Sequence, residues 1–260
     1  MTDLVTVLWI TTVAGAATGL GALPVLFRTG ISHRVYDSAL GLAAGVMLSA
    51  SAFALIAPGL EIGTLPAVMG GVLLGGAALL VANWLLPHVH GRWNSWYGHG
   101  GIEAEDPTKF DSLRRAVLIG GAITLHNAPE GLAIGVAFAS GLEGVGIAVA
   151  VVIGLQNVPD GFAFAVPTAE TGLSNTKILA YTTLSGLVPQ VLAAVLGFTL
   201  VAFVEGLFPI AAGFAAGAMV AVVFREMVPS SHGHGYADEA TIAFLVGFAL
   251  IVVVDEVLVV

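Results

Sequence analysis

The chain contains no cysteine and few charged residues. Without cysteine it can form no disulfide bond, iron–sulfur cluster or thiolate metal site, so any metal must be held by nitrogen, oxygen or thioether ligands. Only 10% of its 260 residues are Asp, Glu, Lys or Arg, whereas an ordinary soluble domain has about a quarter. The mean hydropathy is +0.97. Together these values predict an integral membrane protein.

Apolar runs of about 20 residues, the length that crosses the hydrocarbon core of a membrane, recur along the whole chain. So many runs favour helices, which satisfy their own backbone hydrogen bonds, over the alternating pattern of a barrel. We therefore expect one all-α transmembrane domain over residues 1–260, with eight spanning helices. The predicted helices cover residues 4–27, 37–58, 65–86, 113–138, 144–167, 177–203, 208–229 and 240–260, and residues 87–112 form a loop.

The basic residues all fall on one side of this eight-helix topology. Because cytoplasmic loops collect Lys and Arg, both termini are predicted to face outward, in a multi-pass protein of the plasma membrane. The net charge of −9 indicates either an acidic outer face that concentrates cations or an acidic, lysine-poor proteome. The basic residues are Arg28, Arg34, Arg92, Lys109, Arg114, Arg115, Lys177 and Arg225, and the outward acids are Asp3, Glu61, Glu143, Glu205, Asp255 and Glu256.

Two short segments are repeated within the chain. LHNAPEGLAIGVAFA, from Leu125, and LQNVPDGFAFAVPTA, from Leu155, share Leu, Asn, Pro, an acid and Gly. GLAAGVML, from Gly41, and GFAAGAMV, from Gly213, are also alike, although the general preference of membrane helices for small residues explains this second pair equally well. Such symmetry is typical of secondary transporters with a site near the membrane midplane. We expect a 3+2+3 arrangement, in which inverted repeats of three helices flank a central pair.

The central pair of helices carries four polar side chains at similar depth. Residues i and i+4 share a helix face, so His126 lies beside Glu130 and Gln156 beside Asp160. Two acids at this depth are costly unless they are paired or coordinated, and they repel each other. A divalent cation removes both difficulties. One imidazole with carboxylates and amide oxygens suits zinc, iron, manganese or cobalt and disfavours Cu(I).

Each motif also contains a proline and an asparagine. Pro129 and Pro159 each remove a backbone donor, so we expect bending and local unwinding beside the site. Asn127 and Asn157 can add carbonyl oxygen ligands or hold the histidine from behind. Two other interpretations of these polar residues stay open, namely an interhelical hydrogen-bond network and a proton relay.

At these residues the chain resembles the ZIP (Zrt-/Irt-like) family of metal transporters, and most of all its prokaryotic GufA-type branch. The resemblance covers nearly all of the chain and is most specific in HNAPEG and QNVPDG. It implies eight spans, outward termini, a 3+2+3 plan and a transported ion bound halfway across by these two motifs. In the family a methionine of the second helix contributes, and Met47 matches it. On its own, a methionine in an apolar helix indicates packing.

The chain departs from this family in its fifth and sixth helices. Relatives with a two-metal centre tend to have an acid directly after the glutamine of the fifth helix, where this chain has Asn157. They usually have SGLxEP in the sixth helix, where this chain has SGLVPQ from Ser185. We therefore expect a single ion. Its main ligands would be His126, Glu130, Gln156 and Asp160.

The seventh helix departs from the family as well. The family's HExxP appears as REMVP, from Arg225 to Pro229. The resemblance implies that Glu226 keeps an acid on the inner route of the ion. Arg225 replaces a histidine, and it either pairs with Glu226 as a gate or anchors the helix end at the cytoplasmic interface.

Further histidines occur in two predicted cytoplasmic segments. They either bind metal loosely, as in the His-rich loops of the family, or belong to flexible loops without such a role. They are His88, His90 and His99 in the loop 87–112, and His232 and His234 in SSHGHG.

The sequence thus predicts a transporter that moves a divalent metal into the cytoplasm, with zinc as the first candidate and iron, manganese, cobalt or cadmium as alternatives. The metal is the substrate, and no cofactor, enzymatic activity or nucleic-acid partner is predicted. Neither the GxxxxGK[ST] motif of ATP-driven proteins nor the HExxH of an intramembrane hydrolase occurs. The main alternative is a proton- or ion-conducting channel through the same site. Membrane lipid surrounds the chain. Gly-rich faces such as GGVLLGGAALL permit close helix contacts within the chain or between chains, so a homodimer is possible as a partner arrangement.

Overall fold

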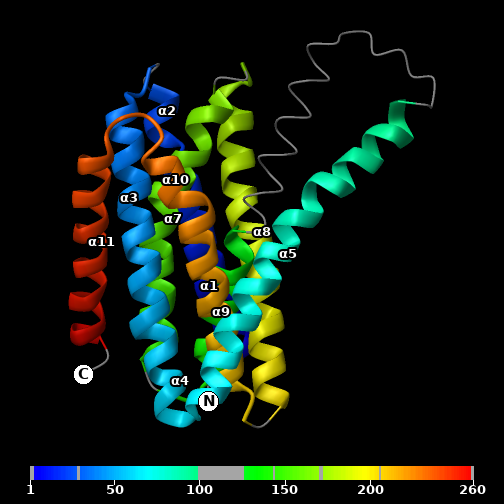
Figure 1. Ribbon diagram of the computed structural model, residues 1–260, viewed down its shortest axis with the longest axis vertical. Helices are drawn as coiled ribbons and strands as arrows, with labels where there is room; N and C mark the ends of the chain where they lie inside the picture. The colour runs from blue at the N-terminus through cyan, green and yellow to red at the C-terminus, as the bar shows by residue number, and fades with distance from the viewer. Residues whose placement is uncertain are drawn as a thin grey trace.

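The computed structural model describes residues 3–27, 30–98, 126–142, 144–169, 172–204 and 206–258. Within these ranges every regular element is a helix and no strand occurs (Figure 1). The elements are α1 (Leu4–Leu20), α2 (Leu23–Phe27), α3 (His33–Ser49), the π-helical segment η1 (Ala50–Ile56), α4 (Ala57–Ile62), α5 (Leu65–Gly98), a helix at residues 126–139, α7 (Val145–Ala169), α8 (Asn175–Phe203), α9 (Phe208–Val222), the π-helical segment η2 (Val223–Met227), α10 (Val228–Ser231) and α11 (Ala237–Leu258).

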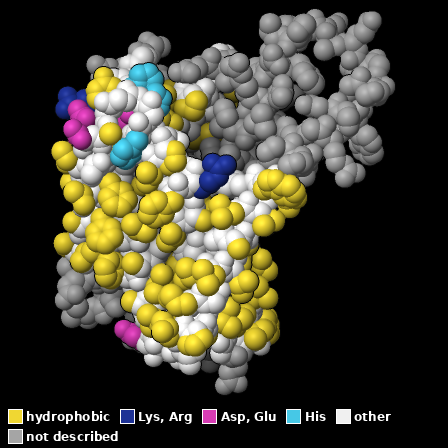
Figure 2. Space-filling view, viewed as in Figure 1, with side chains coloured by type: hydrophobic (Ala, Val, Ile, Leu, Met, Phe, Trp, Pro, Cys, Tyr) yellow, Lys and Arg dark blue, Asp and Glu magenta, His cyan; other side chains and the backbone are white. Residues whose placement is uncertain are grey.

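Seven helical segments are long and apolar enough to cross a membrane. They coincide with seven of the predicted runs, and the remaining run, 113–138, is described only from residue 126. Trp9, Phe27 and Phe203 are among the large apolar side chains exposed on the flanks, and Figure 2 shows hydrophobic side chains across the visible flank. The chain is therefore a multi-pass membrane protein. The seven segments are Leu4–Phe27, His33–Ile62, Leu65–Leu85, Val145–Ala169, Asn175–Phe203, Phe208–Ser231 and Ala237–Val254.

The helix α5 is longer than its apolar run. The predicted helix ends at residue 86, whereas α5 continues to Gly98. The prediction that a loop begins at residue 87 is therefore wrong for residues 87–98, and the rest of that loop lies outside the described residues. The physical reason is that hydropathy marks where a helix leaves the membrane, whereas helical hydrogen bonds form equally well in polar sequence.

Proline does not act on the helices as the sequence suggests. Residues 126–139 and α7 stay helical through Pro129 and Pro159, so the local unwinding expected there is not found. A single proline removes one hydrogen bond, and the neighbouring bonds hold the helix together. Widened, π-helical turns occur instead before two other prolines. The segment η1 ends two residues before Pro58, and η2 ends two residues before Pro229. In a π-helix the i→i+5 bonds relieve the clash between a proline ring and the preceding carbonyl.

The helices pack in close pairs. α3 lies along α11, α5 lies along α9, and α1 packs against both α8 and α7. Glycine makes these approaches possible, because a Cβ at Gly45 would clash with the carbonyl oxygen of Phe244 in α11, and one at Gly75 would clash with that of Phe214 in α9. Gly75 belongs to the Gly-rich stretch that was expected to make close contacts within the chain or between chains, and here it contacts α9 of its own chain.

The start of α1 and the end of α11 lie at the same, lower end of the molecule in Figure 1. α1 begins there because the Asp3 side chain caps it, with the Thr6 amide donating to Asp3 Oδ1 at 2.8 Å. This hydrogen bonding holds the pKa of the Asp3 carboxyl below its ordinary value. The largest apolar core runs through the centre of the bundle, where Met47, Ile134, Ile153 and Met219 are completely buried.

Candidate metal centre

Three of the residues predicted to bind metal converge inside the bundle. His126 and Glu130 lie one turn apart on the helix at residues 126–139, and Asp160 comes from α7. His126 Nε2 lies 3.9 Å from Glu130 Oε1 and 3.5 Å from Asp160 Oδ2. One ligand atom from each of the three residues lies within 4.8 Å of the other two. The i, i+4 spacing thus aims all three side chains at one point between the helices.

Gln156 joins the two acids from within α7. Its Nε2 donates to Glu130 Oε1 at 2.6 Å and to Asp160 Oδ2 at 3.3 Å. In this arrangement Gln156 is a hydrogen-bond donor, and its predicted role as an oxygen ligand requires a half-turn of the amide about its last bond. The two ends of an amide have nearly the same shape, so that turn places Oε1 where Nε2 lies now.

The cluster is buried and its hydrogen bonding is incomplete. The Glu130 side chain is 0% exposed, that of Asp160 8% and that of His126 12%. In the described part of the chain, one polar atom on each of the four side chains has no hydrogen-bond partner: His126 Nε2, Glu130 Oε2, Gln156 Oε1 and Asp160 Oδ1. No described Lys or Arg nitrogen lies within 4.0 Å of either carboxylate. Buried carboxylates without a cation are costly, so this geometry suits a positively charged ligand.

Glu226 lies closer to this cluster than the sequence indicates. Its Oε2 is 3.8 Å from His126 Nδ1, on the other ring nitrogen from the one that faces Glu130 and Asp160. Its Oε1 accepts a hydrogen bond from Asn83 Nδ2 of α5 at 2.9 Å. The resemblance placed Glu226 on the inner route, and the structure brings it against the histidine itself, from the π-helical segment η2.

Sequence reasoning missed Asn83. The signal for it was a lone amide in the otherwise apolar run 65–86. A single amide of this kind is common in membrane helices, where it often bonds across to a neighbour. It therefore did not reveal which partner it holds.

The asparagines beside the cluster turn toward other helices. Asn157 Nδ2 donates to Ala14 O of α1 at 2.7 Å and to Gln190 Oε1 of α8 at 2.9 Å. Asn127 Nδ2 donates to Ser185 O of α8 at 3.4 Å. In this structure both amides hold the two metal-site helices against α1 and α8, and their role as ligands stays a prediction.

Two further predicted residues have surroundings of a different kind. Met47 is fully buried in the central apolar core, which agrees with a packing role, and its sulfur ligand role stays a prediction from the resemblance. Arg225 is exposed and forms no ion pair with Glu226. The latter observation favours a helix-end anchor over a paired gate.

The histidines of the predicted cytoplasmic segments are described in part. His99 lies outside the described residues, as do the side chains of His88 and His90. His232 turns back on its own chain, since its Nδ1 lies 3.0 Å from Val228 O and from Ser231 Oγ. His234 turns instead toward α3, where its Nδ1 lies 2.8 Å from Asp37 Oδ1.

A cavity of about 300 Å³ leads away from the cluster. His126, Asp160 and Glu226 line its deep end, and Tyr36 of α3 and Ser230 of α10 also line it. These last two residues belong to the end of the molecule where α3 begins and α10 ends, which is the upper end in Figure 1. The cavity thus connects the candidate ligands with the end of the bundle opposite the start of α1.

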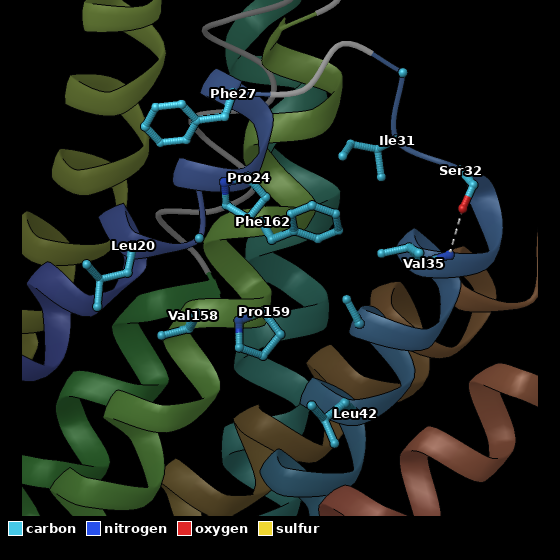
Figure 3. Close-up of a pocket in the computed structure, with 13 residues that line it drawn as sticks. Leu20, Pro24, Phe27, Ile31, Ser32, Val35, Leu42, Val158, Pro159 and Phe162 are labelled. Carbon is cyan, nitrogen blue, oxygen red and sulfur yellow. Dashed lines mark hydrogen bonds between the residues drawn. The ribbon is translucent and has the colours of Figure 1, made fainter.

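A second hollow, of about 960 Å³, opens on the flank between α1, α2, α3 and α7 (Figure 3). Except for Ser32, its described lining is apolar or glycine, with the rings of Pro159 and Phe162 facing into it. It borders the opposite side of α7 from Asp160 and offers no carboxylate. Its chemistry suits hydrocarbon, and it does not suit an ion path.

The chain is similar to known proteins over most of its length. The family model described as ZIP zinc transporter matches residues 99–255, a stretch that contains both central motifs and Glu226. The zinc transporter GufA of Myxococcus xanthus is 39% identical over 251 residues, covering 93% of this chain and 94% of the relative. The chain belongs to the ZIP family.

Other ZIP proteins are similar over nearly the whole chain. The zinc transporter ZIPB of Bordetella bronchiseptica is 39% identical over 259 residues, which cover 94% of this chain and 78% of that protein. The zinc transporter ZIP11 of Homo sapiens is 30% identical over 328 residues, covering 95% and 94%. The GufA-type resemblance is thereby confirmed, and these ZIP proteins are named as transporters and not as enzymes.

Proposed function

We propose that this protein carries a divalent metal ion, with zinc first, into the cytoplasm through a site formed by His126, Glu130, Gln156 and Asp160. The observation that carries the proposal is the buried, converging group of one imidazole and two carboxylates whose free atoms lack hydrogen-bond partners in the described part of the chain. A divalent ion supplies the missing charge and the missing partners at once. The names of the relatives support zinc over the other metals.

A single ion at this site is part of the proposal. Asn157 donates to Gln190 and to the backbone of α1 through its neutral amide. Asn157 stands where binuclear relatives were expected to offer an acid, and Pro189, beside Gln190, stands where they were expected to offer the other. Neutral amides compensate less charge than carboxylates, so a second dication beside the first would be strongly disfavoured. Met47, Asn127 and Asn157 remain candidates for an additional ligand when the ion passes.

The ion leaves toward the cytoplasm along the cavity that begins at His126. Glu226 borders this cavity next to the cluster, so its carboxylate can accept the ion as the other two release it. Arg225 anchors the helix end. Loosely bound metal then meets the histidines of the cytoplasmic segments, His88, His90, His99, His232 and His234.

The proposed topology has eight spans with both termini outside and inverted repeats of helices 1–3 and 6–8. Its support is the exchange of packing partners. In these repeats α3 corresponds to α9, and α5 corresponds to α11. The α3–α11 pair therefore corresponds to the α9–α5 pair, and both pairs are present. The two π-helical segments add a second correspondence, because each ends two residues before a proline of its own repeat. The proposal also places the protein in the plasma membrane and includes a homodimer.

Transport requires that the site face each side in turn. Within the α3–α11 and α5–α9 pairs, the helices pack closely because Gly45 and Gly75 have no side chain. The His126–Glu226 contact, in contrast, joins the central helices to η2 through long side chains at 3.8 Å. We propose that movement between repeats breaks this looser contact and leaves the glycine pairs intact.

Metal uptake into vesicles that contain the purified protein tests the proposed function. Zinc, iron, manganese and cadmium are supplied separately, and uptake is compared with that of His126→Ala/Glu130→Ala. We expect wild-type zinc uptake and a decrease in the double variant of roughly tenfold or more, since two ligands are lost. Glu61→Ala removes an exposed carboxylate at the end of α4 and serves as the matched control, with uptake like wild type.

Equal uptake of all four ions by wild type and the double variant would contradict the transport proposal. Ion flow that persists without any metal, driven by a proton gradient alone, would instead support the proton-conducting channel. Counting bound zinc per chain tests the single-ion part, which two tightly bound ions at the cluster would rule out.

A further inference from the structure

A second group of metal-binding side chains lies at the end of the bundle where α3 begins. His234, in the turn between α10 and α11, places its Nδ1 2.8 Å from Asp37 Oδ1 of α3. The ring of His33, the first residue of α3, stacks on that of His234 with centroids 4.4 Å apart and planes 10° apart. Figure 2 shows histidine side chains gathered at this upper end of the molecule. Neither His33 nor Asp37 stood out in the sequence.

The Asp37 carboxylate prepares His234 to bind a metal. Asp37 is 0% exposed, and its Oδ2 has no hydrogen-bond partner among the described residues. A carboxylate accepts hydrogen bonds, so the shared hydrogen lies on Nδ1 of His234 and leaves the lone pair on Nε2. Histidines that bind metals commonly have this arrangement, in which a carboxylate fixes the ring and makes the other nitrogen a better ligand. The His234 side chain is 37% exposed, so the ring is not enclosed by the bundle.

His33 can supply the second nitrogen. Its ring lies against His234 and its side chain is exposed, so rotation about its side-chain bonds can turn a ring nitrogen toward the same ion. Two imidazoles completed by water suit a borderline ion such as Zn²⁺ and suit Mg²⁺ or Ca²⁺ poorly, because those ions prefer oxygen. His232, two residues before His234, is engaged with Val228 O and does not belong to the group.

The group lies beside the inner end of the cavity that starts at the metal centre. Tyr36 lines that cavity, and its ring contacts His234 edge-on with centroids 5.7 Å apart. Ser230, four residues before His234, lines the cavity too. An ion that moves from His126 along the cavity therefore arrives next to His33 and His234.

We propose that His33 and His234, oriented by Asp37, form a second divalent-metal site of zinc-like preference at the inner end of the cavity. Its role as a station for ions that leave the protein rests on the proposed transport function, whereas its ability to bind metal does not. The competing explanation is that the Asp37–His234 contact only ties the α10–α11 turn to α3. Under that explanation, changes here alter stability and leave zinc binding unchanged.

The test isolates this site in the full-length protein. The parent variant carries His126→Ala, Glu130→Ala, His88→Ala, His90→Ala and His99→Ala, and is purified with a tag that lacks histidine. Zinc titration by calorimetry is expected to find one ion per chain. His33→Gln and His234→Gln should each weaken binding by about tenfold or more, and Asp37→Asn by roughly 10- to 100-fold, as for other residues that orient a metal ligand. Tyr236→Phe, an exposed position of the same turn, is the matched control and should bind like the parent.

A parent variant that binds no zinc would overturn the proposal. Zinc binding that is unchanged in both His33→Gln and His234→Gln would also overturn it. His33 is exposed, so its variant keeps the test valid where the buried Asp37 variant fails to fold. Zinc uptake by wild-type protein in vesicles is measured separately. If uptake occurs but the second site binds no zinc, the transport function stands and this site is rejected. If the second site binds zinc but no uptake occurs, this site stands and the transport function is rejected.

Discussion

At the scale of single residues, the polar side chains inside the bundle fall into two groups by what they touch. Glu130, Gln156 and Asp160 bond mainly to one another around His126 and leave atoms that lack partners in the described part of the chain. Asn157 Nδ2 donates to Gln190 Oε1 and to Ala14 O of α1, and in the described part of the chain Asn157 Oδ1 and Gln190 Nε2 lack partners as well. Of the two groups, the first alone combines two carboxylates with an imidazole, and buried carboxylates are costly without a cation, so the first group is the candidate ion site.

Asn83 offers a test of how Glu226 takes part. Asn83→Ala removes the hydrogen bond to Glu226 Oε1, so the carboxylate is no longer held against His126. We expect zinc uptake to decrease by roughly threefold to tenfold, corresponding to about 1 kcal/mol for a hydrogen bond to a partly exposed charge. Initial rates of uptake at several zinc concentrations provide the measurement.

Asn175→Ala is the control for this change, because Asn175 makes a long, exposed hydrogen bond to Leu26 O at 3.4 Å. Its uptake should equal that of wild type. If Asn83→Ala transports zinc as well as the control does, then Glu226 needs no positioning and its contact with His126 is incidental.

At the scale of elements, the helices of the bundle are continuous at the candidate metal centre and widened where Glu226 lies. The helix at residues 126–139 and α7 stay helical through their prolines, which gives the ligands a rigid support. Glu226, in contrast, lies in the π-helical segment η2. A π-helix has weaker, wider turns than an α-helix, and such a turn can let this carboxylate shift toward and away from the site.

Close packing through glycine is testable at the α3–α11 contact. Gly45→Ala adds a Cβ that clashes with the Phe244 carbonyl, so we expect a loss of about 1–3 kcal/mol, as for other overpacked contacts. The apparent Tm of the detergent-solubilised protein should fall by several degrees. Gly70→Ala, where a Cβ would meet no atom of the structure within 4 Å, should leave the Tm unchanged or raise it. Equal Tm values for the two variants would show that the close contact does not hold the helices together.

At the scale of the whole molecule, the two ends of the bundle differ in chemistry. The starts of α3 and α11 meet at one end, where Arg34 pairs with Glu239 at 3.1 Å beside the His33–His234 stack. The start of α1 and the end of α11 lie at the other end (Figure 1). If the rule that basic residues remain inside holds here, the first end faces the cytoplasm and receives the ion.

The absence of native cysteine makes this orientation directly testable. Glu61→Cys and His232→Cys place single thiols at exposed positions of opposite ends. In intact cells a membrane-impermeant maleimide should label Cys at position 61 and leave position 232 unlabelled until the membrane is opened. The reverse pattern would invert the topology and the proposed direction of transport.

Much of the fold and part of the site could be predicted from local sequence. Long apolar runs specify membrane helices because each helix satisfies its own backbone, and seven of the runs coincide with helices of the structure. The convergence of His126, Glu130 and Asp160 followed from i, i+4 spacing on two adjacent helices. The contacts of Asn83 and Gln190 could not be predicted in this way, because they join residues 143 and 33 positions apart.

The amino-acid sequence alone determined the class of protein, the family and the chemistry of the central ligands, since these depend on hydropathy, on motif residues and on spacing within a helix. Only the tertiary structure decided that Glu226 lies against His126, that the asparagines turn outward to α1 and α8, and that His33, Asp37 and His234 meet. The physical reason is that a contact between helices depends on their crossing and rotation. These are set by glycine contacts and packing along the whole length of each pair, and no short stretch of sequence contains them.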